Sequence, residues 1–230
     1  MIAKKDFNPI YFNAMLNSYT KSEGYFDEAF KLFQCMKQNN ISIDERTWSA
    51  MISISGVNKK LKHLEIIHQE MVASGQKMTN ILLTALVTAY SRCGEVNKAI
   101  QVFNSAPPNT ELDFITKNSL LSAYSQKEGY LNEAIDLFGK MKTNNVLINE
   151  VTWISMISAC GVNKHLKYLE EIHKEMIERG QTVTPYLTST LISAYSSCGN
   201  IRESISIFEK STHKSDIGVF NSMLSAFNQN

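Results

Sequence analysis

The chain has 230 residues, of which 43% are hydrophobic and 20% charged, and its 23 basic and 22 acidic side chains leave a net charge of +1. This composition excludes collagen-like, disulfide-rich and disordered chains, and the charge balance argues against a basic tail that holds nucleic acid non-specifically. No apolar run approaches the roughly 20 residues of a membrane span, so no membrane partner is expected. The four cysteines lack Cys-x-x-Cys spacing and favour reduced, buried thiols in an intracellular compartment.

Residues 1–8 form a short N-terminal flank without the apolar stretch of a signal peptide. From residue 9 onward, apolar side chains recur at spacings of three and four, as in Phe26, Ala29, Phe33 and Met36. This spacing predicts helices, and no comparable alternating strand pattern is present. The chain is therefore predicted to be all-α.

The helical pattern repeats along the chain. One aromatic or histidine position recurs every 35 residues, at Phe33, His68, Phe103, Phe138, His173 and Phe208. A longer period of 105 lies above it, because segments 45–79 and 150–184 are identical at 21 of 35 positions. Self-similarity at this period is typical of stacked helical repeats.

Each repeat is expected to be a helical hairpin. Residue types that tolerate positive φ stand where the first helix should end, at Gly24, Gly94, Gly129 and Gly199, and where the second should end, at Asn40, Gly75, Asn145 and Gly180. One such hairpin cannot bury its apolar stripe alone, whereas stacked hairpins can. We therefore predict one continuous α-solenoid, a right-handed superhelix, with repeats at 9–44, 45–79, 80–113, 114–149, 150–184, 185–216 and a partial repeat at 217–230.

The first helix indicates the family. A tetratricopeptide unit requires Trp-x-x-Leu-Gly-x-x-Tyr there, but this chain has Asn13-Ala14-Met15-Leu16, Asn118-Ser119-Leu120-Leu121 and Asn221-Ser222-Met223-Leu224. The pattern resembles pentatricopeptide repeats of the triplet class. Segments 9–44, 114–149 and 217–230 resemble its standard (P) unit, segments 45–79 and 150–184 its long (L) unit, and segments 80–113 and 185–216 its short (S) unit.

The resemblance implies a sequence-specific partner, single-stranded RNA. In that family the fifth residue of the first helix and the last residue of each P or S unit read one base. The implied reading positions are Asn13 with Asp44, Thr84 with Asp113, Asn118 with Asn149, Ser189 with Asp216, and Asn221 without a partner.

The chemistry of these side chains suggests letters for each pair. Ionised Asp only accepts and suits the N–H of uracil or guanine, whereas the Asn amide can donate to cytosine N3. Asn at the fifth place fits a pyrimidine, and the shorter Ser or Thr leaves room for a purine. The expected ligand is U-n-G-C-n-G-pyrimidine, with U as second choice at the repeat of Asn118 and Asn149. The long units, with Ser49/Thr79 and Ile154/Thr184, are expected to space rather than read.

Two further sets of residues are candidates for contacts with RNA. The resemblance implies that the second place of each reading unit, at Ile10, Ile81, Ile115 and Tyr186, lies between successive bases. Lys21 and Arg92 are weaker candidates for phosphate contacts, since surface cations are often only solvated.

No catalytic site is expected. His68-Gln69-Glu70 and His173-Lys174-Glu175 match only the first half of a zinc-deaminase signature, and the Pro-Cys-x-x-Cys half is absent, so these histidines are expected to pack. We expect no metal, no cofactor and no small-molecule substrate. The resemblance implies the specificity part of a mitochondrial or plastid RNA processing or C-to-U editing factor, with other editing-complex proteins as further partners. A tetratricopeptide-like protein scaffold and a purely structural array segment remain as alternatives.

Overall fold

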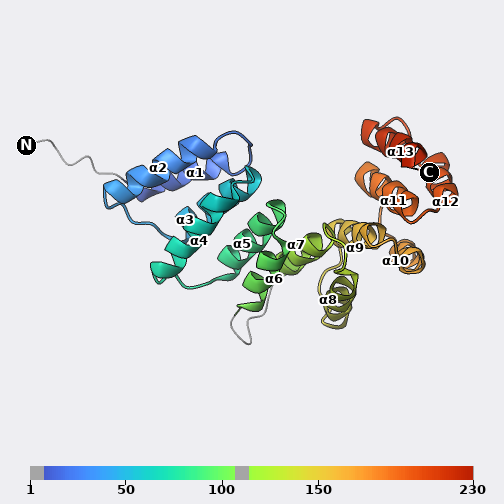
Figure 1. The fold of residues 1–230 in the computed structure, drawn as a ribbon, viewed down its shortest axis with the longest axis horizontal. Coiled ribbons are helices and arrows are strands. Elements are labelled where there is room, and N and C mark those ends of the chain that lie inside the picture. The colour runs from blue at the N-terminus through green and yellow to red at the C-terminus, as the bar shows by residue number, and fades with distance from the viewer. Residues whose placement is uncertain (1–7, 107–113, 230) are drawn as a thin grey trace, which may run out of the picture. The chain divides into compact units, whose positions relative to one another are not determined.

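The computed structural model describes residues 8–106 and 114–229 (Figure 1). That part of the chain contains thirteen α-helices and no strand, so the all-α prediction is confirmed. The helices are α1 Pro9–Tyr19, α2 Phe26–Gln38, α3 Glu45–Val57, α4 Leu61–Ala73, α5 Asn80–Arg92, α6 Val96–Asn104, α7 Phe114–Tyr124, α8 Leu131–Thr143, α9 Glu150–Val162, α10 Leu166–Glu178, α11 Pro185–Ser197, α12 Ile201–Lys210 and α13 Ile217–Gln229.

Two compact halves make up the chain, Met1–Leu120 and Leu121–Asn230, and their boundary falls within α7. Odd-numbered helices are the first helices of the repeats, and even-numbered helices are the second helices. We number the repeats 1 to 7 in chain order, with repeat 1 at 9–44 and repeat 7 at 217–230. The fold within each half is a stack of helical hairpins, and the right-handed superhelix across the whole chain stays a prediction.

The hairpins end where the sequence predicted. All eight of the stop residues named above have positive φ, from 51° at Asn145 to 95° at Gly129. Two further residues with positive φ, Lys59 (51°) and Lys164 (52°), end the first helices of repeats 2 and 5. There the glycines lie inside the helix instead, at Gly56 and Gly161, where they serve packing.

The core repeats with the same period as the sequence. Ala29 and Phe33 of α2 are buried, as are Ala134 and Phe138 of α8. The eighth residue of the first helix is fully buried in each of the first six repeats, at Leu16, Ile52, Val87, Leu121, Ile157 and Ile192. Trp48 and Trp153 pack edge-on against Phe33 and Phe138, with ring centroids 5.5 and 5.6 Å apart. The tryptophans are therefore part of the packing between repeats.

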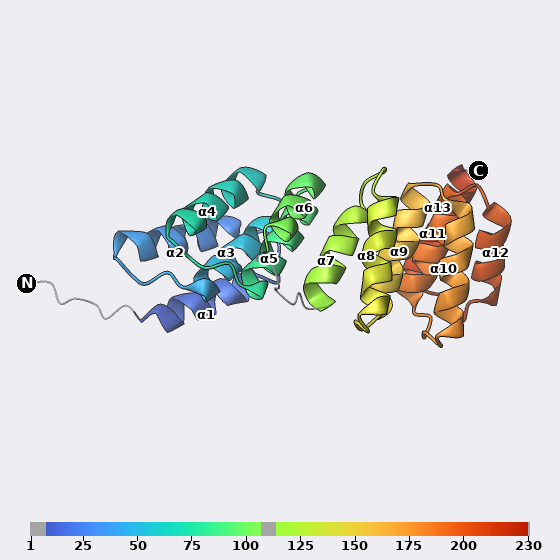
Figure 2. The same cartoon turned by 90° about the horizontal axis from the view of Figure 1, so that it is seen from below.

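Consecutive first helices touch one another, α1 with α3 and α3 with α5 in the N-terminal half, α9 with α11 and α11 with α13 in the C-terminal half. Figure 2 shows α9, α11 and α13 side by side in the C-terminal half. Equivalent residues of successive first helices therefore lie in neighbouring layers. Among the described helices, none combines the length and the apolarity that crossing a bilayer requires.

Candidate RNA-binding surface

The second place of the first helix is exposed in every repeat for which it was named. Ile10 is 67% exposed, Ile81 59%, Ile115 50% and Tyr186 66%, although the third place directly after each in α5, α7 and α11 is buried. Each of these large apolar side chains is thus open to a flat apolar partner at its own position. The structure therefore exposes the four residues that were expected to sandwich bases.

The structure brings together the two residues of repeat 1 that were predicted to read a base. The Asn13 amide nitrogen donates to both carboxylate oxygens of Asp44, at 3.1 and 3.3 Å, although the two residues are 31 positions apart. Thr47 completes the cluster, because its backbone N–H and its hydroxyl both approach Asp44 Oδ1, at 3.0 and 3.1 Å. The fifth and last residues of this repeat thus lie side by side, as the resemblance implied.

The charge of Asp44 is stabilised by this cluster. Burial alone would raise the pKa of Asp44, but hydrogen bonds from Thr47 and Asn13 outweigh it and hold the pKa below its ordinary value. The carboxylate is therefore ionised at neutral pH and can only accept hydrogen bonds.

In repeat 3 only one member of the pair can be placed. Asp113 lies outside the described residues. The Thr84 hydroxyl donates to the Asn80 carbonyl oxygen at 2.7 Å and lies 2.5 Å from the hydroxyl of Thr116, the third residue of repeat 4. The same third place that holds Thr47 in repeat 2 thus contacts the fifth residue of the preceding repeat here too.

Repeat 4 has its pair on opposite sides of the boundary between the halves. Asn118, in the N-terminal half, is only 5% exposed and is the least open of the five fifth-place residues. Asn149, in the C-terminal half, is half-buried, and its Oδ1 accepts from the backbone N–H and the hydroxyl of Thr152, both at 3.2 Å. The pairing of Asn118 with Asn149 stays a prediction.

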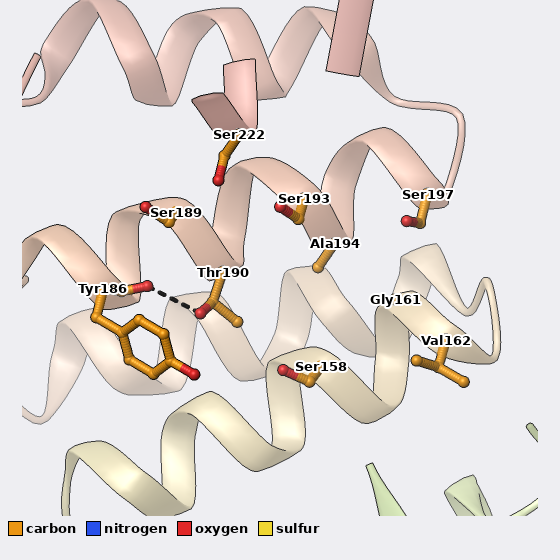
Figure 3. A pocket seen from close by; sticks show the side chains of 10 residues that line it. All are labelled: Ser158, Gly161, Val162, Tyr186, Ser189, Thr190, Ser193, Ala194, Ser197 and Ser222. Atoms are coloured by element: carbon orange, nitrogen blue, oxygen red, sulfur yellow. Dashed lines mark hydrogen bonds between the residues drawn. The ribbon is translucent and has the colours of Figure 1, made fainter. Parts of the chain in front are cut away.

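Repeat 6 lines a hollow in the C-terminal half. Tyr186 and Ser189 of α11 border a cavity of about 320 Å³ together with Ser158 of α9 and Ser222 of α13. Figure 3 shows these side chains coming from three successive first helices. Asp216 caps α13 through Oδ1, which accepts from the backbone N–H groups of residues 218 and 219. This hollow combines an aromatic ring with several hydroxyl groups.

Asn221, the fifth residue of repeat 7, is exposed.

Repeats 2 and 5 are built differently. Their last residues, Thr79 and Thr184, each accept a backbone N–H of the next helix and donate their hydroxyl hydrogen to Glu45 and Glu150 respectively. Each hydroxyl is thus engaged within the protein as donor and as acceptor. The expectation that these repeats space rather than read stays a prediction.

The candidate phosphate contacts are exposed. Lys21 follows α1, and Arg92 is the last residue of α5. Neither forms an ion pair with any described residue, whereas Lys37, Lys98 and Lys142 join consecutive second helices by ion pairs. Their role toward phosphate stays a prediction. The described residues contain no group of three or more His, Cys, Asp or Glu arranged to hold a metal.

The sequence analysis did not anticipate a second role for the last residue of a repeat. Wherever it is described, this residue is also the N-cap of the next first helix or binds its first backbone N–H groups: Asp44, Thr79, Asn149, Thr184 and Asp216. Asp44 with Thr47 and Asn149 with Thr152 form capping boxes. A cap residue followed three positions later by a second hydrogen-bonding side chain is a readable signal for such a helix start.

Comparison with known families agrees with this architecture. The family described as PPR repeat matches residues 46–76, 81–106, 151–181 and 187–214, and the one described as PPR repeat family matches residues 8–54 and 112–162. The chain therefore belongs to the pentatricopeptide repeat (PPR) family.

Relatives in Arabidopsis thaliana extend beyond this chain. The mitochondrial pentatricopeptide repeat-containing protein At2g03380 is 30% identical over 97% of this chain and 31% of its own length. The chloroplastic protein At4g25270 is 27% identical over 100% of this chain and 42% of its own length. The chain thus spans less than half the length of these relatives.

Among solved structures, PPR10 of maize in complex with an 18-nt psaJ RNA element is similar over 99% of this chain and 34% of that chain, with a TM-score of 0.79 and 22% sequence identity. The nuclear proteinaceous RNase P 2 of A. thaliana has a TM-score of 0.58 over 88% of this chain and 42% of that chain, at 15% identity. These two likenesses support the fold, an α-solenoid of helical hairpins.

Proposed function

We propose that this chain is a sequence-specific, single-stranded RNA-binding module that reads one base at each of repeats 1, 3, 4, 6 and 7. The observation that carries the proposal is the hydrogen-bonded pair of Asn13 and Asp44 in repeat 1. A peptide-binding groove has no need for an amide and a carboxylate joined in this way. A base has a Watson–Crick edge that needs both a donor and an acceptor side by side.

Helix capping supports the assignment of letters. In Asp44 the oxygen Oδ1 serves the cap, and Oδ2, which also accepts from the Asn13 amide nitrogen at 3.3 Å, has a second lone pair for a base N–H. In Asn149 the same atom serves the cap, which leaves the amide nitrogen as the side chain's donor. At the same capping position, Asp therefore presents an acceptor to the base, which suits U or G, and Asn presents a donor, which suits C. The full proposed ligand is U-n-G-C-n-G-pyrimidine, read 5′ to 3′ along the chain.

The exposed apolar places support a stacking role. Ile10, Ile81, Ile115 and Tyr186 would each cover a base face next to the reading pair. Stacking of a base on an aromatic side chain contributes about 1–3 kcal/mol, so Tyr186 should contribute most. With a net charge of +1, the chain should make few phosphate contacts and show a shallow dependence of affinity on salt.

The names of the relatives suggest the cellular setting. They include mitochondrial and chloroplastic proteins, and PPR10 was solved with RNA. We place this chain in a mitochondrion or plastid, as the specificity part of an RNA processing or C-to-U editing factor.

Fluorescence anisotropy tests the proposal. One labelled RNA carries the proposed letters, and a matched RNA has U exchanged with C and G exchanged with A. We expect tighter binding to the first RNA. Equal affinity for both would refute base reading, and no binding to either at low salt would favour a protein-binding scaffold.

A further inference from the structure

Three buried threonines recur at one place of the stack, the third residue of a first helix. Thr47, Thr116 and Thr152 are each 0% exposed and begin repeats 2, 4 and 5. A hydroxyl group in such a position must be hydrogen-bonded, since an unbonded buried hydroxyl is costly. Two of them, Thr47 and Thr116, contact the fifth residue of the preceding repeat.

Thr47 contacts both members of the pair in repeat 1. Its hydroxyl oxygen lies 2.8 Å from Asn13 Oδ1 and accepts from the Asp44 backbone N–H at 3.3 Å. A threonine hydroxyl has one hydrogen, and of the two acceptors within reach Asn13 Oδ1, at 2.8 Å, is nearer than Asp44 Oδ1, at 3.1 Å. Thr47 therefore donates to Asn13.

This contact determines how Asn13 faces a ligand. Asn13 Oδ1 is held by Thr47, and one hydrogen of its amide nitrogen is held by Asp44. What is left for a base is the second amide hydrogen, a donor, next to the ionised Asp44, an acceptor. That order matches the carbonyl and N3–H of uracil, whereas cytosine offers an amino group and a lone pair at the same places.

We propose that Thr47 is a positioning residue that holds Asn13 as a hydrogen-bond donor and so sharpens the selection of U over C at repeat 1. The inference rests on the proposed function and names a residue outside the reading pair. Thr116 plays the equivalent part in repeat 3. The single hydroxyl hydrogen of Thr84 goes to the Asn80 carbonyl, so Thr116 is the donor in the 2.5 Å contact with Thr84.

The other repeats argue against a packing role for the hydroxyl. The same third place holds Leu82 and Leu187 after the spacing repeats 2 and 5, and Val219 after repeat 6, all fully buried. Apolar side chains therefore fill this position without difficulty. The hydroxyl is present behind Asn13 and Thr84 and absent behind Ser49 and Ile154, the fifth residues of the spacing repeats. It is also absent behind Ser189 of repeat 6, so the positioning role concerns repeats 1 and 3.

The test compares Thr47→Val, which keeps the shape and removes the hydroxyl, with Thr47→Ser, which keeps the hydroxyl. Affinity is measured by anisotropy for two RNAs that differ only by U or C opposite repeat 1. Loss of one hydrogen bond of ordinary strength should reduce the U-over-C ratio about three- to tenfold in Thr47→Val. Thr47→Ser should stay within about twofold of the unaltered chain.

Thr188→Val is the matched control. Thr188 is also buried, but its hydroxyl donates to the Thr184 carbonyl within its own helix at 2.9 Å. Its substitution should leave the U-over-C ratio unchanged. NMR of the free protein adds a readout without RNA, because the side-chain amide signals of Asn13 should shift in Thr47→Val and stay in Thr188→Val.

The outcomes separate this inference from the proposed function. An unaltered chain without any preference for U opposite repeat 1 would refute the base reading on which the inference rests. A chain that prefers U, with the same ratio in Thr47→Val, would refute the positioning role alone. Unchanged Asn13 amide signals in Thr47→Val would also overturn it.

Discussion

The boundary between repeats 1 and 2 is polar and half-open, whereas the boundary between repeats 2 and 3 is closely packed. At the first, Asn13, Asp44 and Thr47 meet through hydrogen bonds between side chains. At the second, Gly56 lies directly against the next first helix, and a Cβ atom added to it would be only 2.6 Å from Ala89 Cα. The first boundary has hydrogen-bonding groups to offer a ligand, and the second uses its surface for helix packing.

The packed boundary recurs between repeats 5 and 6. A Cβ atom added to Gly161 would lie 2.9 Å from Ala194 Cα. His173 Nδ1 and the Tyr195 hydroxyl are 3.0 Å apart, and the matching distance from His68 to Tyr90 is 2.9 Å. The difference between the boundaries therefore belongs to the kind of repeat, and it supports the proposal that repeats 2 and 5 act as spacers.

The largest expected effect comes from filling the packed boundary. Gly56→Ala would push a methyl group into the Ala89 backbone and should destabilise the N-terminal half by about 1–3 kcal/mol. Gly139→Ala is the matched control, because Gly139 is also helical and has no atom within 4 Å of an added Cβ. It should raise stability by up to about 1 kcal/mol. Urea unfolding monitored by circular dichroism measures the free energy of unfolding of both variants. Equal changes in the two variants would contradict the difference in packing.

A substitution of the last residue should change the preferred RNA base only in a repeat that reads a base. Asn149→Asp keeps the cap of α9 and exchanges a donor for an acceptor, so repeat 4 should shift from C toward U by about tenfold, or about 1.4 kcal/mol. Thr184→Asn, a cap-preserving change at spacing repeat 5, should alter no base preference. Anisotropy with RNAs that vary one base at a time checks both. An unchanged preference in Asn149→Asp would refute the donor–acceptor assignment.

The boundary between repeats 1 and 2 also has a hydrogen bond at the C-terminal ends of its first helices. The backbone N–H of Gly24 donates to Asn58 Oδ1 at 2.7 Å, and that of Gly129 donates to Asn163 Oδ1 at the same distance. Asn58→Ala should destabilise the boundary of repeats 1 and 2 by about 1 kcal/mol. Asn163→Ala should do the same in the other half. Thermal unfolding that leaves both variants as stable as the unaltered chain would show that this hydrogen bond contributes nothing.

The smallest effect should be a dependence of stability on pH from the packed boundaries. Burial lowers the pKa of His68 and of His173. The unfolded chain, with histidine pKa near 6.5, then binds protons before the folded chain does, so stability should fall as pH decreases from about 6.5 to the lower folded pKa. Asp44, whose pKa is below the ordinary value, acts only at more acidic pH.

Melting temperatures between pH 7.5 and 5.5 test this dependence. Replacing both histidines by phenylalanine, the residue at the equivalent place of four other repeats, should flatten the profile. A profile that stays as steep in the double variant would place the titrating groups elsewhere.

The 35-residue period and the stop residues predicted the helical hairpins, because each glycine or asparagine stop needs a left-handed backbone that few residues adopt easily. Lys59 and Lys164 were missed as stops because nothing in a lysine side chain favours positive φ. They take that conformation in repeats whose glycines, Gly56 and Gly161, are needed inside the helix by a neighbouring repeat. A packing constraint that comes from a neighbouring repeat cannot be predicted from the local sequence.

The candidate site was also predictable in part. The spacing of Asn13 and Asp44, seen through the family resemblance, predicted a pair that the structure brings within hydrogen-bonding distance. Thr47 was missed because it begins the next repeat and touches the pair only when the hairpins stack. The near-complete burial of Asn118 also depends on its surroundings in the fold, which periodicity does not describe.

The joint duty of Asp44 and Asn149 as helix caps limits how such a chain could be retargeted. Side chains that cap well are short and oxygen-bearing, and replacing one by alanine costs about 0.5–2 kcal/mol. If the last residue of a repeat is changed to alter the target RNA, only a few side-chain types are therefore available. Longer amides, carboxylates or cations would allow other base contacts only by destabilising the start of the following helix. Base specificity and the stability of the next helix therefore depend on the same side chain.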